Sequence, residues 1–132
     1  MSNSFLLDTH AFFWLLRTPD RIPKRTISAL EDPANKIYVS AVVAFEIATK
    51  VRLGKFPQAQ PLDQAFDARV SDIGASSLPL TVDHALAAGR FDWDHRDPFD
   101  RLLAAQAIVE NLRLVTSDAA FQNLPGLRVA WQ

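Results

Sequence analysis

The sequence predicts an α/β fold, a three-layer α/β/α sandwich around a central parallel sheet of four to five strands. Short apolar runs, typical of buried strands, alternate along the chain with longer stretches of helical periodicity. This alternation favours a parallel sheet with helices on both faces. The chain has 132 residues, 48% hydrophobic and 22% charged, so we expect residues 1–132 to form a single globular domain.

The first elements are a strand and two helices. The apolar run SFLL predicts a buried strand at 4–7, and THAFFWLLR has helical spacing at 9–17. Two prolines then interrupt the chain. KRTISALEDP predicts a short amphipathic helix that ends before Pro33, because the residue before a proline avoids the helical conformation.

A second strand and a longer helix follow. KIYVS predicts a strand at 36–40, and Ser40 is a suitable N-cap for the helix at 41–55, which should stop near Gly54. After a proline-bearing loop, a helix is predicted at 62–74. The remaining elements continue the alternation: a short extended piece, a helix capped by Thr81, a largely apolar helix and two strands separated by a turn of helix. They are predicted at 76–80, 82–90, 98–111, 112–117 and 127–131.

Acidic residues follow two of the predicted strands. Asp8 comes directly after the strand at 4–7, and Asp118 follows the strand at 112–117. Because the carboxyl ends of parallel strands lie at one edge of a sheet, where α/β proteins bind ligands, we expect the two acids at the same edge. Each also has a structural interpretation, as a helix N-cap or a turn residue.

The stretch HRDPFDRLLAAQA, residues 95–107, places two carboxylates at the start of an apolar helix. Asp97 suits the N-cap position, with Pro98 as the first helical residue, and this explains it structurally. Asp100 lies in the first turn, where the helix dipole favours negative charge, and shares a face with apolar residues. We therefore expect Asp100 at the inner corner of the sheet edge, near Asp8.

Glu46 is the only charged residue between Lys36 and Lys50. Its helical neighbours are largely apolar, and burying an unpaired carboxylate costs several kcal/mol. An ion pair with Lys50 is the structural alternative, and on a surface it would contribute only about 0.3–0.5 kcal/mol. The helix has few polar positions that could define a solvent face, so we favour a functional role for Glu46.

Four acids gathered at one edge would repel one another, and a divalent cation would remove that conflict. The chain has no cysteine, so a metal would be held by oxygen or nitrogen, which favours Mg²⁺ or Mn²⁺. Such a site supports hydrolysis of a phosphodiester, because bound water becomes a better nucleophile and the cation offsets the phosphate charge. The candidate catalytic residues and metal ligands are Asp8, Glu46, Asp100 and Asp118, with Asp97 and Thr116 as possible additions.

Charge and hydropathy limit which binding partners and which cellular compartment we expect. The net charge is −1, so a nucleic-acid site would be a local basic patch. The N-terminal apolar run is interrupted by Asp8 and His10, and no Lys or Arg precedes it. It predicts neither a signal peptide nor a membrane span, and the expected compartment is the cytoplasm.

Four blocks of the sequence resemble, in order and spacing, the acidic motifs of PIN-domain ribonucleases, above all the VapC toxins of bacterial toxin–antitoxin systems. The blocks are LLDTHAFFWLL, VSAVVAFEIATK, HRDPFDRLLAAQA and LVTSDAAF, and the likeness covers essentially the whole chain. By motif position the family's four acids fall on Asp8, Glu46, Asp100 and Asp118. Thr116 falls on a supporting hydroxyl, and Asp97, common in the DPFD subgroup, could join the site or only cap its helix.

The resemblance implies a PIN-like fold and an Mg²⁺-dependent endoribonuclease that acts on structured RNA, often tRNA or ribosomal RNA. It also implies a homodimer and a small VapB-type antitoxin encoded beside it. Basic side chains next to the acids could contact phosphates locally, although each could equally be a solvated helix end, and Arg101 is expected to point into solvent. These candidates are Lys50, Arg52, Lys55, Arg96 and Arg101.

The histidines and tryptophans are expected to be structural. The three histidines lack metal-ligand spacing and are expected at caps or on the surface: His10, His84 and His95. The three tryptophans are expected in the core or in dimer contacts rather than as platforms for base stacking: Trp14, Trp93 and Trp131.

Other functions fit the sequence less well. A phosphatase of the dehalogenase type needs a second Asp two residues after the first, where this chain has His10, and a receiver domain needs paired acids near the first strand and a late Lys. A non-catalytic RNA- or protein-binding module has no reason to keep clustered acids. A PIN-fold nuclease for RNA processing rather than toxicity stays open, and a neighbouring antitoxin reading frame would distinguish the two.

Overall fold

A five-stranded sheet, in which each neighbouring pair of strands is parallel, forms the centre of the computed structural model, which describes residues 3–132. The strand order is β3-β2-β1-β4-β5. The strands are Ser4–Leu7 (β1), Lys36–Ser40 (β2), Ser76–Leu78 (β3), Arg113–Val115 (β4) and Val129–Ala130 (β5). The predicted parallel sheet is confirmed, with β1 and β2 at their predicted bounds. Strands β4 and β5 are shorter than predicted; after β4 the chain turns at Thr116 into the next helical turn.

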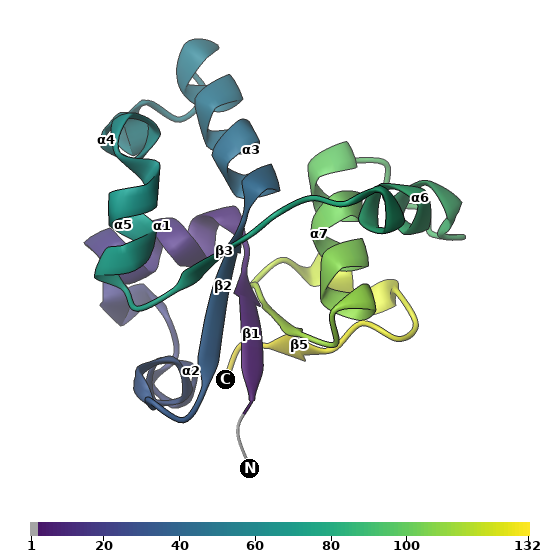
Figure 1. Ribbon diagram of the computed structural model, residues 1–132, viewed down its shortest axis with the longest axis horizontal. Coiled ribbons are helices and arrows are strands. Elements are labelled where there is room, and N and C mark those ends of the chain that lie inside the picture. Colours follow the sequence, from purple (N-terminus) through teal and green to yellow (C-terminus); the bar gives the residue numbers. More distant parts are fainter. Residues whose placement is uncertain (1–2) are drawn as a thin grey trace.

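Helices cover the sheet on two sides, which confirms the three-layer α/β/α arrangement (Figure 1). Helices α1, α2, α4 and α5 lie on one side, α6 and α7 lie on the other, and α3 rises from the end of β2. The α-helices are Thr9–Arg17 (α1), Lys24–Glu31 (α2), Ala41–Arg52 (α3), Gln60–Gln64 (α4), Phe66–Asp72 (α5), Val82–Arg90 (α6) and Pro98–Val109 (α7). Short 3-10 turns complete the set at Pro19–Arg21 (η1), Pro57–Ala59 (η2) and Ala119–Asn123 (η3).

The single helix predicted at 62–74 is wrong, because the segment is divided into α4 and α5. The break lies at Ala65, whose φ of −141° and ψ of 46° are not helical. Helix α4 packs on α3, whereas α5 runs on toward β3, so the chain changes direction between them. Apolar periodicity alone did not reveal this change, because Leu62 and Val70, one from each helix, are both buried in the core.

The predicted helix ends are confirmed by their caps. Ser40 accepts a hydrogen bond from the N–H of Val42 at the start of α3, and Gly54, at a φ of 72°, follows its end. A φ in the left-handed region suits glycine, which has no Cβ to clash. At the start of α6, Thr81 and His84 form a reciprocal capping box. These local interactions fix where each helix leaves the sheet.

Between α3, α6 and α7 runs a chain of buried polar side chains that the apolar pattern of α7 did not predict. The Ser40 hydroxyl donates to Oε1 of Gln106 at 2.5 Å, and the Gln106 amide donates to the carbonyl of Pro79 at 3.3 Å. His84, fully buried, contacts Glu110 through Nε2 at 2.7 Å. Because buried polar groups need partners, these contacts tie the start of α3 to the middle of α7.

The register of β1 places the residue that follows it. Leu7 pairs with Val39 of β2 and with Val115 of β4, so Asp8 emerges between the ends of both neighbours. Its backbone N–H donates to the carbonyl of Val115 at 3.1 Å. Asp8 is thus fixed at the carboxyl edge of the sheet, where the sequence placed it. Among the helices of residues 3–132, none has the length and apolar character that crossing a membrane requires.

Candidate active site

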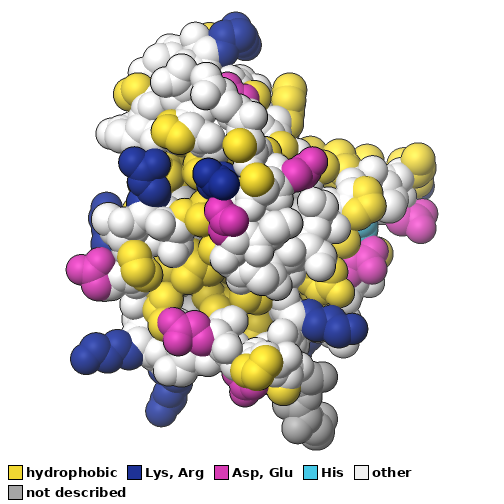
Figure 2. Space-filling view, turned by 60° about the vertical axis from the view of Figure 1, so that its left-hand side comes forward, with side chains coloured by type: hydrophobic (Ala, Val, Ile, Leu, Met, Phe, Trp, Pro, Cys, Tyr) yellow, Lys and Arg dark blue, Asp and Glu magenta, His cyan; other side chains and the backbone are white. Residues whose placement is uncertain are grey.

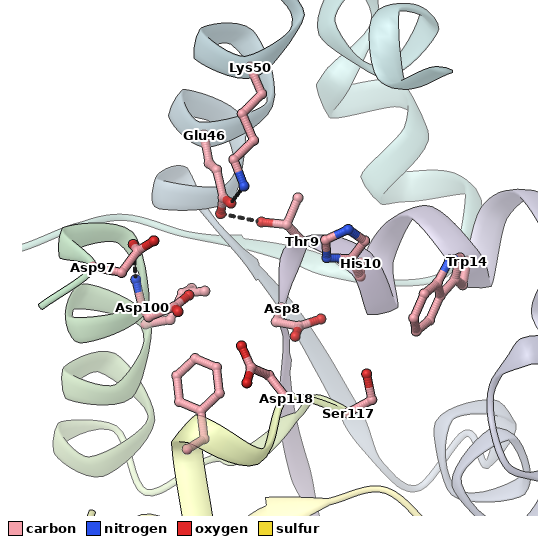
Figure 3. A pocket seen from close by; sticks show the side chains of 12 residues that line it. Asp8, Thr9, His10, Trp14, Glu46, Lys50, Asp97, Asp100, Ser117 and Asp118 are labelled. Atoms are coloured by element: carbon pink, nitrogen blue, oxygen red, sulfur yellow. Dashed lines mark hydrogen bonds and ion pairs between the residues drawn. The ribbon is translucent and has the colours of Figure 1, made fainter. Parts of the chain in front are cut away.

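A pocket of about 430 Å³ opens at the carboxyl edge of the sheet, between α1, α3, α7 and the segment after β4 (Figure 3). All four acids singled out from the sequence line it, together with Asp97. Figure 3 shows that Asp8, Glu46, Asp100 and Asp118 come from separate segments and surround one space, with Asp97 beside Asp100 at the start of α7. The lining residues are Asp8, Thr9, His10, Trp14, Glu46, Lys50, Asp97, Asp100, Leu103, Ser117, Asp118 and Phe121.

Asp8 is both a helix cap and a wall of this pocket. Its Oδ1 accepts a hydrogen bond of 2.8 Å from the N–H of Ala11, so it is the N-cap of α1. Burial raises its pKa, while the Thr116 hydroxyl and the Ala11 amide oppose that shift by stabilising the ionised form. The structural and functional interpretations of Asp8 therefore do not exclude each other.

Asp118 repeats this arrangement at the end of β4. Its Oδ1 accepts from the N–H of Ala120 at 2.9 Å and caps η3, while its own N–H donates to the Thr116 hydroxyl at 3.1 Å. Thr116 is buried, and its hydroxyl contacts both the backbone of Asp118 and the carboxylate of Asp8. It thus has the supporting place that the sequence indicated.

Asp97 and Asp100 differ in surroundings although they share one helical turn. Asp97 is exposed, and its Oδ1 accepts from the N–H groups of Phe99 at 2.9 Å and Asp100 at 3.2 Å, which confirms it as the N-cap of α7. Asp100 is partly buried and contacts Nε2 of His95 through Oδ2 at 2.6 Å. Burial, with a smaller contribution from the charge of Asp97, raises the pKa of Asp100 to about 6.

Glu46 has two close partners. The residue is 6% exposed, and its Oε1 accepts from the Thr9 hydroxyl at 2.6 Å. Its Oε2 pairs with Nζ of Lys50 at 2.5 Å, so the ion pair considered from the sequence exists, yet it lies in the pocket wall rather than on an outer helix face. Lys50 is therefore engaged with Glu46. The hydroxyl and ammonium offset part of the cost of burying this carboxylate.

The pKa values of Asp8 and Asp100 are raised mainly by burial rather than by repulsion between the acids. The sequence led us to expect repulsion among the acids, but burial is the largest cause of the raised pKa of both Asp8 and Asp100, and the charge of Glu46 is the smallest for each. The carboxylates are spread around the pocket, and Asp8 and Asp97 sit at the positive N-terminal ends of α1 and α7. Both features weaken the mutual repulsion, so desolvation is the stronger effect.

The donor chemistry of the pocket fits a hard divalent cation. Carboxylate oxygens from Asp8, Glu46, Asp100 and Asp118 line it, and Mg²⁺ prefers oxygen ligands with several retained waters. Within residues 3–132, however, no group of three or more Asp, Glu or His side chains is close enough together to hold an ion. Glu46 is turned onto Thr9 and Lys50, and in Figure 3 the side chain of Asp8 turns away from that of Asp100.

Comparison with known proteins identifies the family. A family model described as the PIN domain matches residues 5–127. The chain belongs to the PIN-domain family. This PIN domain has relatives that are named VapC ribonucleases. It is 30% identical to ribonuclease VapC22 of Mycobacterium tuberculosis over 116 residues, 86% of this chain and 85% of that protein.

Other matches agree with this assignment. Ribonuclease VapC16 of M. tuberculosis is 42% identical over 65 residues, which covers 49% of this PIN domain and only 45% of that protein. Among solved structures, VapBC2 of Rickettsia felis, bound to a DNA fragment from the promoter, gives a TM-score of 0.71 at 21% identity over 98% of this chain and 99% of that chain. VapBC-1 of nontypeable Haemophilus influenzae gives 0.67 at 19% identity over 96% of both chains. These two likenesses establish the fold.

Arg101 departs from the expectation. Rather than pointing into solvent, its guanidinium donates to the backbone carbonyls of Ala88, Phe91, Trp93 and His95 at 2.6–3.0 Å. Its donors are thus used within the protein, and it holds the loop before α7 rather than standing ready for a phosphate. The sequence pattern missed this because Arg101 follows an acid at a helix start, where a basic side chain normally remains solvated.

Two further contacts to the acids were not predicted. Thr9 donates to Glu46, and His95 contacts Asp100, although His95 was expected at a cap or on the surface. Thr9 had one sequence signal, its position directly after Asp8. Nothing in the spacing of His95 announces its contact, because the fold of the loop before α7 decides where the ring points.

Three of the basic residues proposed for RNA contacts are exposed: Arg52, Lys55 and Arg96. The face shown in Figure 2 carries its basic side chains singly, among hydrophobic and acidic ones, rather than as a continuous stripe. Phosphate contacts there would therefore be local, in agreement with the net charge of −1.

Substitution should separate the roles of the two aspartates of α7. Asp97→Ala removes the N-cap and should lower the free energy of unfolding by about 0.5–2 kcal/mol while largely preserving nuclease activity. Asp100→Ala should abolish activity and metal affinity with little loss of stability. Urea unfolding and cleavage assays on both purified variants measure the two effects, and the reverse pattern would show that the roles have been exchanged.

The raised pKa of Asp100 should also appear as a pH dependence of stability. The pKa of this carboxyl is 3.8 in the unfolded chain and about 6 in the folded one, so folding favours its neutral form. Its stabilising contribution is complete below the unfolded value and is lost as the pH rises through about 6. Without divalent ions, wild type should therefore lose roughly 1–3 kcal/mol more than Asp100→Asn between about pH 4 and 7.

Urea unfolding across this range measures the effect. Asp67→Asn, on the exposed side of α5, controls for the general loss of one negative charge. Identical pH profiles for wild type and Asp100→Asn would contradict the assignment.

Proposed function

We propose that this chain is an Mg²⁺-dependent endoribonuclease, the toxin of a toxin–antitoxin pair, that cleaves structured RNA such as tRNA or ribosomal RNA. The observation that carries this proposal is the meeting of Asp8, Glu46, Asp100 and Asp118 around one pocket at the carboxyl edge of the sheet. These acids come from four separate segments, and no local structural need brings all of them to one place. The ribonuclease names of its VapC relatives support RNA as the substrate.

The four carboxylates would hold the cation, which supplies a polarised water and offsets the phosphate charge when bound. The chain's own contacts orient these groups. Ala11 and Ala120 fix one oxygen each of Asp8 and Asp118 through backbone N–H groups, and Thr9 fixes one oxygen of Glu46. These contacts restrict the carboxylates, but Glu46 would still have to turn from Thr9 and Lys50 toward the cation, because no three acids within residues 3–132 lie close enough together to hold an ion.

The phosphate backbone of RNA would meet a few basic side chains beside this pocket. Arg52, Lys55 and Arg96 are exposed and able to approach phosphates, whereas Lys50 first has to leave Glu46. Such contacts position a nucleic acid without reading its sequence. We therefore expect target selection to depend on RNA shape around the cut rather than on base contacts from these residues.

We also propose that the chain binds a small VapB-type antitoxin, forms a homodimer and acts in the cytoplasm. Solved structures with this fold include the VapBC complexes of R. felis and H. influenzae and a toxin–antitoxin complex from Klebsiella pneumoniae. Copurification with the product of an adjacent short reading frame, and light scattering on the free chain, test the first two parts.

Neutralising Asp8 should abolish RNA cleavage without unfolding the protein. Asp8→Asn keeps the size of the side chain and its N-cap, and it removes a charge that burial disfavours, so stability should be unchanged or slightly higher. The assay incubates wild type and variant with total RNA in Mg²⁺ or EDTA and maps the new ends. Loss of folding together with activity would make Asp8 structural, and cleavage by wild type in EDTA would remove the metal from the proposal.

Metal binding should stabilise the folded chain. A ligand that binds only the folded state raises the melting temperature by mass action, so Mg²⁺ or Mn²⁺ should do so. Asp100→Asn and Glu46→Gln should show smaller rises, because each removes a charged ligand, and lower pH should weaken binding because protons compete for the same oxygens. Calorimetric titration compares the three proteins, and equal affinity in all of them would contradict the metal site.

A further inference from the structure

The side chain of His95 touches an acid of the proposed site. His95 lies in the loop between α6 and α7, and its Nε2 is 2.6 Å from Oδ2 of Asp100. When Asp100 is ionised, as a metal ligand must be, its carboxylate can only accept hydrogen bonds, so the ring nitrogen donates. The charge-assisted bond occupies one of the two oxygens of Asp100. The function proposed above assigns no role to this histidine.

Aromatic neighbours hold the imidazole ring. Its centroid lies 5.0 Å from the ring of Trp93 and 6.3 Å from that of Phe121, and those two rings are 5.9 Å apart. The His95 side chain is 27% exposed, so it is neither a free surface group nor part of the core. Packing of this kind limits the rotamers of the ring and therefore the direction in which Nε2 points.

Arg101 holds the backbone of the same loop. Its Nε donates to the carbonyl of Ala88 at 3.0 Å, Nη2 donates to that of Phe91 at 2.6 Å, and Nη1 donates to those of Trp93 at 2.8 Å and His95 at 2.9 Å. The planar guanidinium thus joins the end of α6 to the residues leading into α7. Because one acceptor is the carbonyl of His95 itself, Arg101 fixes the point from which the ring projects.

We infer that His95 is a positioning residue for Asp100, held in place by Arg101, and that it sets the direction in which this carboxylate presents its other oxygen to a divalent cation. The inference rests on the proposed function, in which Asp100 is a metal ligand. Groups that hydrogen-bond to metal ligands typically affect metal affinity or activity by about 10–100-fold. The hydrogen bond from His95 to Asp100 is a contact of this kind, made to a ligand rather than to the metal.

Metal affinity measured by calorimetry tests the inference directly. Mn²⁺ is titrated into purified wild type, His95→Ala, His95→Gln and Asp94→Asn, the last an exposed neighbour in the same loop that serves as the matched control. His95→Ala should bind Mn²⁺ about 10-fold or more weakly. His95→Gln can still donate a hydrogen bond and should recover most of the affinity, and Asp94→Asn should bind like wild type.

Cleavage assays supply a second readout. Raising the Mn²⁺ concentration should restore much of the activity of His95→Ala, because its ligands remain, whereas it should not restore that of Asp100→Ala. Wild-type Mn²⁺ affinity in His95→Ala would overturn the inference. Equal loss in His95→Gln and His95→Ala would overturn it too, because ring packing rather than the hydrogen bond would then be responsible.

A double substitution tests the part played by Arg101. Arg101→Lys keeps the charge but cannot span the carbonyls that the guanidinium joins, so Mn²⁺ affinity should fall. If both residues act through one contact, His95→Ala combined with Arg101→Lys should lose no more affinity than the weaker-binding single variant. Additive losses would overturn the role given to Arg101.

The outcomes separate this inference from the proposed function. Wild type that neither binds Mn²⁺ nor cleaves RNA would overturn both. Wild type that does both, beside an unimpaired His95→Ala, would overturn only the positioning role of His95.

Discussion

The hydrogen-bonded register of β1 between β2 and β4 is the constraint on which the site depends. Both neighbours run parallel to β1, so the ends of all three strands open at one edge. The N–H of Asp8 donates to the carbonyl of Val115 at that edge, and Thr116 and Asp118 follow directly after β4 ends. A shift of β1 by one residue would send each of its side chains to the opposite, differently packed face of the sheet and would move Asp8 away from the other acids. Packing of the core therefore also fixes the position of the first acid.

Burial of carboxylates is the cost of this arrangement, and helix starts offset part of it. Asp8 caps α1, where backbone N–H groups are available and the dipole favours negative charge; Asp97 caps α7 in the same way but is exposed, so little burial has to be offset there. Asp100 and Glu46 instead depend on side-chain partners, His95 for the former and Thr9 and Lys50 for the latter. Desolvation still raises the pKa of Asp8 and Asp100. A bound cation would favour the ionised forms that burial disfavours, and would return some of the stability that the pocket costs.

Polar contacts far along the chain hold the helices that bear the acids. Ser40 caps α3 and donates to Gln106 in the middle of α7, while Arg101 in the first turn of α7 joins it to the end of α6. The helices that carry Glu46 and Asp100 are therefore fixed to each other as well as to the sheet. This is how acids that are distant in sequence keep their places around one pocket.

The sequence by itself determined the parallel α/β architecture, most element positions and the four acids, because these depend on periodicity, caps and the order of strands. Asp97 as an N-cap could be predicted for the same reason, since Asp-Pro at a helix start is a local signal. Tertiary structure alone decided the division of α4 from α5, the turn of Glu46 toward Thr9, the contact of His95 with Asp100 and the inward path of Arg101. Each of these depends on where another segment lies in space, and side-chain direction in a loop follows from packing rather than from the spacing of residues along the chain.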